Sequence, residues 1–520
     1  MDFCLEQNIS MTKIFRSLPI LFLVIFFLFP IGKLIYIGVD WRGIWSNNIL
    51  HLLFFTIYQG LFSTVLTLLV AMFLLYLLPM KLNRFQKSAL NILLLLFFLP
   101  IITIAQLIHK VQLLNVFAYI FPIAHPLILI LEANFLFNIG LVTYYLVNAR
   151  STLGQEQLSA AKLDGASEGK IFKFIVLPHL AKRIWAITLL IFVYGVSDLG
   201  TILTFGDQKS KTLELAINNS LVQQIDLKEA CTLGIIQMLF LLACFWMRDL
   251  YKQENFQLYS LELSEYSNLK TRGYIKSGLA NAIFLFLIFP VLYYLISSFL
   301  IFFQKAPTTN PPTTPISIWL ALGNSLRNAS ITTFVVIFLT ICATAFRNSR
   351  NRFNIFYLLP FAISPALLAL ATIVTFGGGF FPLRNYWLVT CVLEVVIFLP
   401  FAYFLFLPAT QLIETELELT LRVSGGDAVD NFIYLFLPLM KRELISLSLI
   451  VFLSSISDFI IPNFVTVGNQ GTLTTLLYHF LFHQNFWNIR GSFLINLFFL
   501  IIGSVLLFLF SNNSSKRSIH

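Results

Sequence analysis

The sequence is poor in charged residues and in cysteine. Only 11% of its 520 residues are charged, whereas about 25% are charged in soluble domains, so this is not the sequence of an ordinary soluble enzyme. Intrinsic disorder is excluded as well, because 58% of the residues are apolar and disorder requires low hydrophobicity. Of the five cysteines, four lie in apolar runs and none shows CxxC spacing. This pattern indicates neither a disulfide framework nor a metal-binding knuckle.

Long apolar runs are abundant, and the mean hydropathy is +0.84. A run of about 20 apolar residues can cross a bilayer as a helix. The first run is too long for the apolar part of a signal peptide, so it is counted as a span. The twelve runs lie at about 18–37, 51–80, 88–109, 126–149, 184–206, 229–247, 278–304, 320–346, 353–376, 387–408, 444–466 and 491–511. The sequence therefore predicts an all-α polytopic membrane protein with about 12 transmembrane helices.

Lysine and arginine are distributed unevenly between the connecting segments. If the N-terminus is cytoplasmic, 24 of the 34 lie in segments on the cytoplasmic side, and the opposite orientation inverts the ratio. Cytoplasmic loops of membrane proteins carry an excess of these residues. We therefore expect both termini in the cytoplasm. The net charge of +10 is attributed to these loops rather than to nucleic-acid binding.

The chain contains an internal repeat at a constant offset of 260 residues. The recurring pairs are Leu99-Pro100 with Leu359-Pro360, Gly165 with Gly425, Leu177-Pro178 with Leu437-Pro438, Ser197-Asp198 with Ser457-Asp458, and Thr212-Leu213 with Thr472-Leu473. Six spans in each copy predict two parallel repeats, 1–250 and 278–520, joined by a cytoplasmic linker at 251–277. A transport path between the repeats is the expected consequence, and duplication for structural reasons alone is the alternative.

Two cytoplasmic loops are longer than the rest, at about 150–183 and 409–443. In each, the sequence predicts a short helix, a glycine, a second short helix, and then Leu-Pro at the start of the next span. Gly165 and Gly425 suit the position after a helix where φ is positive. Pro178 and Pro438 suit the first turn of a helix. One such loop per repeat gives a docking surface for a two-fold symmetric partner.

These loops resemble those of the integral-membrane subunits of binding-protein-dependent ABC importers. Their signature is Glu-Ala-Ala, three residues, Gly, nine residues and Ile-x-Leu-Pro. The matching positions are Ser159, Ala160, Ala161, Gly165, Leu177 and Pro178 in the first loop, and Leu419, Thr420, Leu421, Gly425, Leu437 and Pro438 in the second. The glutamate is missing from both loops, and both alanines are missing from the second.

The resemblance implies a type I ABC importer permease in the bacterial inner membrane. The two loops would then be coupling helices seated on two copies of an ABC ATPase subunit, and a periplasmic substrate-binding protein would dock on the opposite face. ATP and magnesium would be used by that ATPase. This chain would hold no cofactor and would be a transport subunit rather than an enzyme.

A fused pair of repeats is typical of ferric-iron and thiamine permeases within this family. The thiamine permeases are the more similar group, through segments after the first loop and at the second span. These segments are 201–206, 211–217, 234–238, 40–41, 51 and 58–60, with 457–459, 467–469 and 472–473 in the second half. The resemblance implies import of thiamine or its phosphates, with ferric iron as the alternative substrate.

Four acidic residues lie within predicted spans. Asp198 and Asp458 are candidates for the translocation path, because intramembrane carboxylates are often functional and thiamine carries a fixed positive charge. The alternative is that each carboxylate caps a broken helix. For Glu132 and Glu394, hydrogen bonding between helices is the preferred interpretation.

Other motifs carry little functional signal. His479 and His483 have the i, i+4 spacing of a metal pair but no third ligand, so an interfacial aromatic helix is favoured. The segment 165–171 is one residue short of a phosphate-binding loop and lacks its Ser or Thr, so nucleotide binding in this chain is rejected. No HExxH motif supports a membrane-embedded enzyme. A secondary transporter is the other alternative, but it gives no reason for two matched docking loops.

Overall fold

The computed structural model describes residues 15, 17–37, 47–80, 82–112, 126–151, 153–206, 211–222, 226–250, 274–304, 316–345, 356–357, 359–376, 386–410, 423, 430–483 and 485–515. All regular secondary structure in these residues is helical. The helices are η1 (Val24–Leu28), α2 (Phe29–Ile37), α3 (Asn47–Leu77), α4 (Arg84–Phe98), α5 (Ile101–Gln112), α7 (Pro126–Ser151), α8 (Gln155–Leu163), α9 (Glu168–Ile171), η3 (Phe172–Val176), α10 (Leu177–Val196), α11 (Gly200–Phe205), α12 (Leu213–Val222), α13 (Leu227–Leu250), α14 (Tyr274–Leu300), η4 (Ile301–Phe303), α15 (Ile318–Ala345), η6 (Leu359–Ala362), α16 (Pro365–Phe376), α17 (Tyr386–Thr410), η7 (Asn431–Phe436), α20 (Leu437–Ile456), α21 (Ile460–Val465), η8 (Gly468–Gln470), α22 (Leu473–Phe482) and α23 (Phe486–Ser515).

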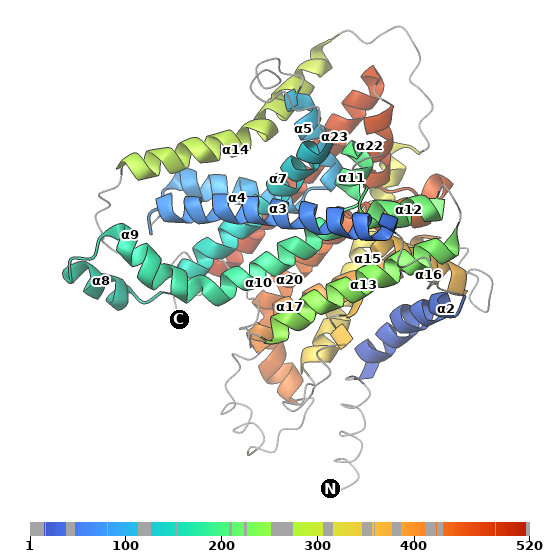
Figure 1. The fold of residues 1–520 in the computed structure, drawn as a ribbon, viewed down its shortest axis with the longest axis horizontal. Coiled ribbons are helices and arrows are strands. Elements are labelled where there is room, and N and C mark those ends of the chain that lie inside the picture. The colour runs from blue at the N-terminus through green and yellow to red at the C-terminus, as the bar shows by residue number, and fades with distance from the viewer. Residues whose placement is uncertain are drawn as a thin grey trace.

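Many of these helices are long and apolar enough to cross a membrane (Figure 1). Within the described residues there are nine of them, or ten if the bent pair of α4 and α5 counts as one span. The prediction of an all-α polytopic membrane protein is confirmed. Of the twelve predicted spans, two fall outside this count. One contains α16, which has only 12 residues, and the other contains α20, which carries Lys441, Arg442 and Glu443 near its start. The number twelve therefore stays a prediction.

Three predicted spans are broken, and each is formed by two helices. The run 88–109 is divided at Leu99–Pro100 into α4 and α5, which are bent by 115°. Leu99 is extended, with φ −78° and ψ 149°, because a following proline disfavours the helical conformation. The runs 184–206 and 444–466 are each interrupted at a Ser-Asp pair, between α10 and α11 and between α20 and α21.

Corresponding helices occur 260 residues apart. This separation holds at both ends of α10 and α20, of α11 and α21, and of α12 and α22. The unusual feature, a helix broken at an aspartate and followed by two short helices, thus occurs twice in the same order. These elements follow the same offset as the recurring sequence pairs.

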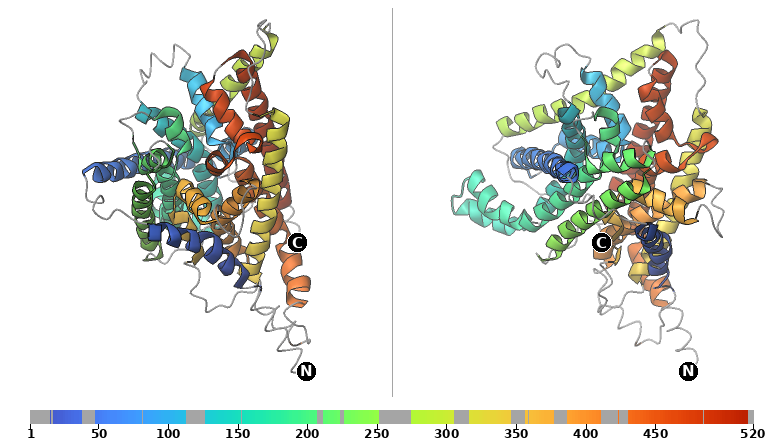
Figure 2. Two further views of the ribbon diagram at one scale, coloured as in Figure 1. Left: turned by 90° about the vertical axis from the view of Figure 1, so that its right-hand side faces the viewer. Right: turned by 45° about the vertical axis from the view of Figure 1, so that its right-hand side comes forward.

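The parts of the chain before and after residues 251–273 interlock (Figure 1, Figure 2). Helix α2 from the first part packs on α16 from the second, and α14 from the second packs along α4 and α5 from the first. The contact between α2 and α16 includes Lys33, whose Nζ donates to the carbonyls of Val374 and Thr375 at 3.2 Å. These carbonyls lie at the C-terminal end of α16, where backbone acceptors lack helical partners.

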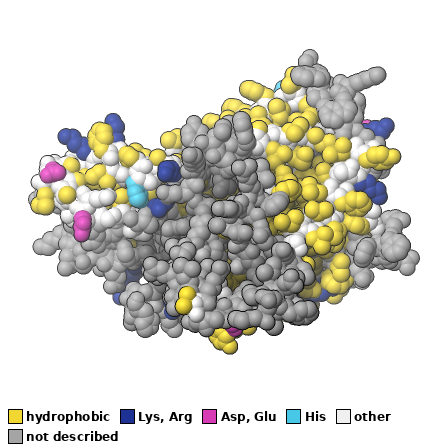
Figure 3. All heavy atoms as spheres, turned by 90° about the horizontal axis from the view of Figure 1, so that it is seen from below, with side chains coloured by type: hydrophobic (Ala, Val, Ile, Leu, Met, Phe, Trp, Pro, Cys, Tyr) yellow, Lys and Arg dark blue, Asp and Glu magenta, His cyan; other side chains and the backbone are white. Residues whose placement is uncertain are grey.

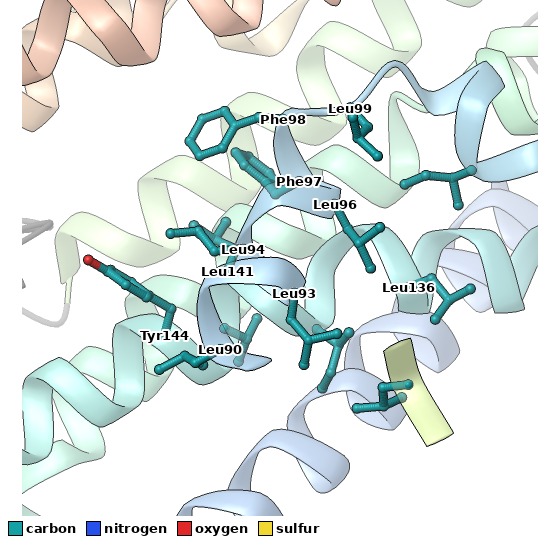
Figure 4. Close-up of a cluster of buried hydrophobic side chains, with 14 of the residues drawn as sticks. Leu90, Leu93, Leu94, Leu96, Phe97, Phe98, Leu99, Leu136, Leu141 and Tyr144 are labelled. Carbon is teal, nitrogen blue, oxygen red and sulfur yellow. The ribbon is translucent and has the colours of Figure 1, made fainter. Parts of the chain in front are cut away.

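A buried cluster of leucine and aromatic side chains joins α4 to α7 (Figure 4). Leu90, Leu93 and Phe97 of α4 belong to it, and Tyr144 of α7 is fully buried in it. The two helices approach closely at Gly140, where an added Cβ would lie only 1.9 Å from the Leu93 carbonyl oxygen. Only glycine permits this approach, because any other side chain would overlap the backbone of α4.

Candidate functional site: the first cytoplasmic loop and the acidic helix breaks

The first predicted coupling loop contains a short helix closed by a glycine. Helix α8 ends at Leu163 with Asp164 as its C-cap, and Gly165 follows with φ +76°. The Gly165 amide donates to the Lys162 carbonyl at 3.1 Å, and the Ala166 amide donates to the Ala161 carbonyl at 3.0 Å. These two bonds form a Schellman motif, which satisfies the last carbonyls of the helix. The predicted positive φ at Gly165 is confirmed.

Helices α8 and α9 project from one end of the molecule (Figure 1). Leu158 is buried and anchors α8, whereas Ala160 is exposed and Ser159 and Ala161 are half-buried. Leu163 is 88% exposed. Figure 3 shows acidic, basic and histidine side chains gathered at this end, on a face whose other end is largely hydrophobic. A charged, protruding helix with an exposed leucine suits contact with a protein outside the bilayer.

The Leu-Pro pairs lie within long helices. Pro178 and Pro438 lie in the first turn of α10 and of α20, as predicted. However, the helix runs on without a break from Glu168 to Val196, so the second short helix of the first loop and the span that follows are one helix. A π-helical turn, η3 or η7, precedes each Leu-Pro pair. A proline has no N–H and its ring collides with the carbonyl four residues earlier, and a widened turn relieves this conflict.

The second predicted coupling loop is described only in part. Leu437 and Pro438 are at the start of α20. The other predicted positions, Leu419, Thr420, Leu421 and Gly425, lie outside the described residues. Their predicted role and conformation stay predictions.

Two arginines fix the stems of the first loop. Arg150 is buried, and its guanidinium donates to the carbonyls of Leu75, Leu78 and Pro79 at 2.7, 2.8 and 2.9 Å. These carbonyls lie in the last turn of α3 and just after it, so one charged side chain satisfies three backbone acceptors. Arg183 donates to the Ala149 carbonyl at 2.9 Å. The loop therefore leaves and re-enters the helix bundle at positions held by hydrogen bonds.

An ion pair ties the loop to the later part of the chain. Lys276 Nζ, near the start of α14, lies 2.7 Å from Glu168 Oε2 on α9. It also donates to the Tyr76 hydroxyl at 3.1 Å and lies 4.2 Å from the centroid of that ring. Because the two charged side chains are 33% and 60% exposed, the ion pair itself contributes at most about 1 kcal/mol.

Asp198 and Asp458 occupy the two matching helix breaks, and both are half-buried. Asp198 accepts hydrogen bonds from the backbone N–H and the hydroxyl of Thr201, in the first turn of α11. Asp458 Oδ1 accepts from the Ile460 N–H at 3.2 Å, in the first turn of α21. Both carboxylates thus stabilise the N-terminus of a short helix, which is the capping alternative that the sequence left open. The second oxygen of Asp458 is buried and accepts no hydrogen bond within the described part of the chain.

Glu394 forms the interhelical contacts expected for it. It is buried, and its carboxylate accepts from the hydroxyls of Thr332 on α15, at 3.0 Å, and of Ser455 on α20. It also lies close enough to Asp458 for their charges to interact. For Glu132 the same expectation is wrong within the described residues, since its side chain is exposed on α7 and forms no hydrogen bond there.

Glu214 is an acidic residue that the sequence reasoning missed. It lies in the first turn of α12, is completely buried, and interacts electrostatically with Asp198. Its carboxylate accepts from Gln237 Nε2 at 2.9 Å and from Ser364 Oγ at 2.6 Å. Glu214 falls within a segment that resembles thiamine permeases, but its charge alone did not mark it as buried, because a polar turn precedes it in the sequence.

The two histidines on α22 form a stacked pair. The rings of His479 and His483 lie 4.3 Å apart and are nearly parallel, and His483 Nδ1 is 3.1 Å from the His479 carbonyl oxygen. No group of three His, Cys, Asp or Glu side chains that suits a metal ion occurs among the residues with described positions.

Comparison with known proteins identifies relatives of one kind. The thiamine transport system permease protein ThiP of Escherichia coli K12 is 25% identical over 215 residues, which cover 38% of this chain and 39% of that protein. ThiP of Salmonella typhimurium LT2 is 27% identical over 216 residues, covering 39% and 40%. ThiP of Haemophilus influenzae Rd is 25% identical over 340 residues, covering 62% and 61%.

The alignments span about two fifths of the first two relatives and about three fifths of the third. They confirm the resemblance to thiamine permeases that the loops and segments indicated. No family model matches the sequence, and no solved structure matches it.

Proposed function

We propose that this chain is the transmembrane permease subunit of an ATP-driven importer and forms the translocation path for thiamine or its phosphates. The observation that carries the proposal is the similarity to three thiamine transport permeases. The fold supports it, because the described residues form a multi-pass bundle of apolar helices. The protein resides in the bacterial inner membrane, with both termini in the cytoplasm.

The proposed partners are two copies of an ABC ATPase subunit and a periplasmic substrate-binding protein. The ATPase would contact the first loop at Ser159, Ala160, Ala161 and Gly165, where α8 projects from the bundle and ends in a rigid cap. The second loop would form the equivalent contact in the other repeat. ATP and magnesium are used by the ATPase, and this chain holds no cofactor.

The proposed organisation is two permease repeats, 1–250 and 278–520, joined by the linker 251–277. The equal spacing of α10–α12 and α20–α22 supports it. The path would run between the repeats, with Asp198 and Asp458 near it at the matching breaks. Since η3 and α10 continue directly from α9, a displacement of the loop is passed along one helix to the Asp198 break.

In physical terms, transport requires two states of the permease that ATP and the binding protein favour to different degrees. ATP-driven closure of the ATPase pair would move α8 and α9, and the rigid helix from Glu168 to Val196 would carry that movement to the path. The loaded binding protein would favour the state that is open to the outside. Hydrolysis of ATP would return the path to the state that is open to the cytoplasm.

The test is uptake into proteoliposomes that contain this chain, its candidate ATPase and its binding protein. Labelled thiamine and ferric iron are supplied separately, with and without ATP. We expect ATP-dependent uptake of thiamine. Uptake of iron alone would keep the architecture and overturn the substrate, and uptake that ignores ATP would overturn the coupling to an ATPase.

A further inference from the structure

A buried carboxylate connects the two parts of the chain. Glu214, on α12 of the first part, is 0% exposed and accepts a hydrogen bond of 2.6 Å from the hydroxyl of Ser364, just before α16 of the second part. Both helices contact each other directly. Of the four described acidic residues that are buried or lie at the breaks, Glu214 forms a hydrogen bond across this boundary, whereas Glu394 is held by Thr332 and Ser455 of its own part.

The charged groups around Glu214 are negative. Asp198 lies close enough to interact with it electrostatically. Among the residues whose positions are described, no lysine or arginine forms an ion pair with either carboxylate. A buried carboxylate without a cationic partner is costly, and proteins normally neutralise or pair such a charge.

The side chain of Gln237 places an unpaired hydrogen-bond acceptor next to Glu214. It is 0% exposed, and its Nε2 donates to Glu214 Oε2 at 2.9 Å, so the side chain points at the carboxylate. Its Oε1 is buried and has no hydrogen-bond partner among the residues that the structure describes. A buried acceptor that is left unpaired is unusual. The carboxylate and this amide oxygen together suit a ligand that brings a positive charge and a hydrogen-bond donor.

Another hydrogen bond joins the two parts of the chain next to the second aspartate break. The hydroxyl of Ser457, beside Asp458, donates to the Phe98 carbonyl oxygen at 2.6 Å. This bond and the bond between Glu214 and Ser364 each involve a residue near a Leu-Pro pair, at positions 99–100 and 359–360. Next to the second bond, an apolar pocket is lined from one side by Phe98 and Tyr144 and from the other by Phe401 and Leu453. Polar bonds and apolar contact therefore close the space between the two parts.

We propose that Glu214 selects for the positive charge of the transported molecule and that its bond with Ser364 holds the path closed until that charge displaces the serine. The inference rests on the proposed function, because it takes the substrate to be an organic cation such as thiamine. The thiazolium ring supplies a fixed positive charge for Glu214, and the amino group of the pyrimidine ring supplies a donor for Gln237 Oε1. Glu214 is thus both a specificity-determining residue and half of a latch.

The test compares thiamine with an analogue in which a thiophene ring replaces the thiazolium and so removes the charge. Initial uptake rates at low concentration are measured in proteoliposomes that contain the full transporter. We expect the wild type to prefer thiamine by about tenfold or more, since the attraction between the thiazolium charge and the Glu214 carboxylate in a site of low dielectric exceeds the free energy that a tenfold preference requires. In Glu214→Gln the preference should fall to about twofold, because the glutamine can still accept from Ser364 but carries no charge. The matched control is Glu394→Gln, which should keep the wild-type preference.

Further variants separate charge from closure and remain informative if Glu214→Gln does not fold. Glu214→Asp keeps the charge and should keep the preference for thiamine. Ser364→Ala removes the latch and should raise ATP hydrolysis in the absence of substrate several-fold, with the preference intact.

Two outcomes would overturn the inference alone: an unchanged preference in Glu214→Gln, or an equal loss in Glu394→Gln. Unchanged basal ATP hydrolysis in Ser364→Ala would overturn the latch. A wild type that takes up no thiamine with ATP would overturn the proposed function and the inference with it.

Discussion

Substitution of Gly165 tests whether the cap of α8 transmits force. Gly165 has φ +76°, and a Cβ added there would meet no atom within 4 Å. The cost of a side chain therefore comes from the backbone alone. A non-glycine residue at positive φ costs about 1–3 kcal/mol, and a β-branched residue is at the upper end of this range. Asparagine tolerates this conformation better. The backbone strain is therefore expected to be smallest in Gly165→Asn, larger in Gly165→Ala and largest in Gly165→Val.

The consequence for the loop is a change of population. A strain of about 3 kcal/mol changes an equilibrium constant by roughly a hundredfold, which is enough to open the Schellman motif for much of the time. In Gly165→Val the amide of Ala166, which now donates to the Ala161 carbonyl at 3.0 Å, should lose protection from hydrogen exchange. ATP hydrolysis should continue while thiamine uptake falls at least tenfold, because α8 no longer moves as one body with α9.

The assay is the ratio of thiamine taken up to ATP hydrolysed, in proteoliposomes that contain the complete transporter. Gly169→Ala is the matched control, since Gly169 also has open space around its Cβ position but no positive φ. It should leave the ratio unchanged, because alanine is favoured within a helix. Normal uptake in Gly165→Val, with normal exchange protection at Ala166, would refute the assignment of this loop as the coupling element.

Three other substitutions address the architecture. Arg150→Met leaves three buried carbonyls without their donor and should lower the free energy of unfolding by about 3 kcal/mol, measured as a fall in the melting temperature in detergent; an unchanged melting temperature would contradict the role of this arginine. Gly140→Ala places a Cβ 1.9 Å from the Leu93 carbonyl oxygen and should lower the free energy of unfolding by about 1–3 kcal/mol, because it forces α4 and α7 apart. The control is Gly323→Ala, at a position with open space, which should leave the melting temperature unchanged. Lys276→Met removes a partly exposed ion pair and should lower the free energy of unfolding by less than about 1 kcal/mol, with a smaller loss at high salt. A larger loss that is independent of salt would show that the packing of Lys276 on Tyr76 dominates.

The sequence predicted features that depend on a few neighbouring residues. The helical membrane class follows from apolar runs, and the positive φ at Gly165 follows from a glycine directly after a short helix. The first-turn positions of Pro178 and Pro438 follow from the geometry of proline, although the π-helical turns before them do not, because a proline is compatible with both a helix start and a widened turn.

Features that depend on distant residues were not predictable. The bond between Glu214 and Ser364 joins residues 150 positions apart, and no local pattern distinguishes Glu214 from an exposed acid. Hydropathy averages over the polar pairs at Asp198 and Asp458, so it predicts spans there and cannot decide whether the chain leaves the helix, which was the capping alternative. The recurring Ser-Asp pairs marked where the two helices break, but the sequence did not decide the backbone conformation at these positions.

The exchange of helices between the two parts of the chain has a consequence for biosynthesis. Helix α14 covers α4 and α5, and α2 covers α16, so each part completes the packing of the other. During translation, α4 and α5 are made before α14, and more than 150 residues separate the end of α5 from the start of α14. Until α14 has been made, the faces of α4 and α5 that it contacts stay uncovered. We expect that either half, expressed alone, would expose an uncovered helix face to lipid and to quality-control proteases. Co-expression of the two halves as separate chains would restore a stable pair, because the contact surfaces are reciprocal and do not require the peptide link between them.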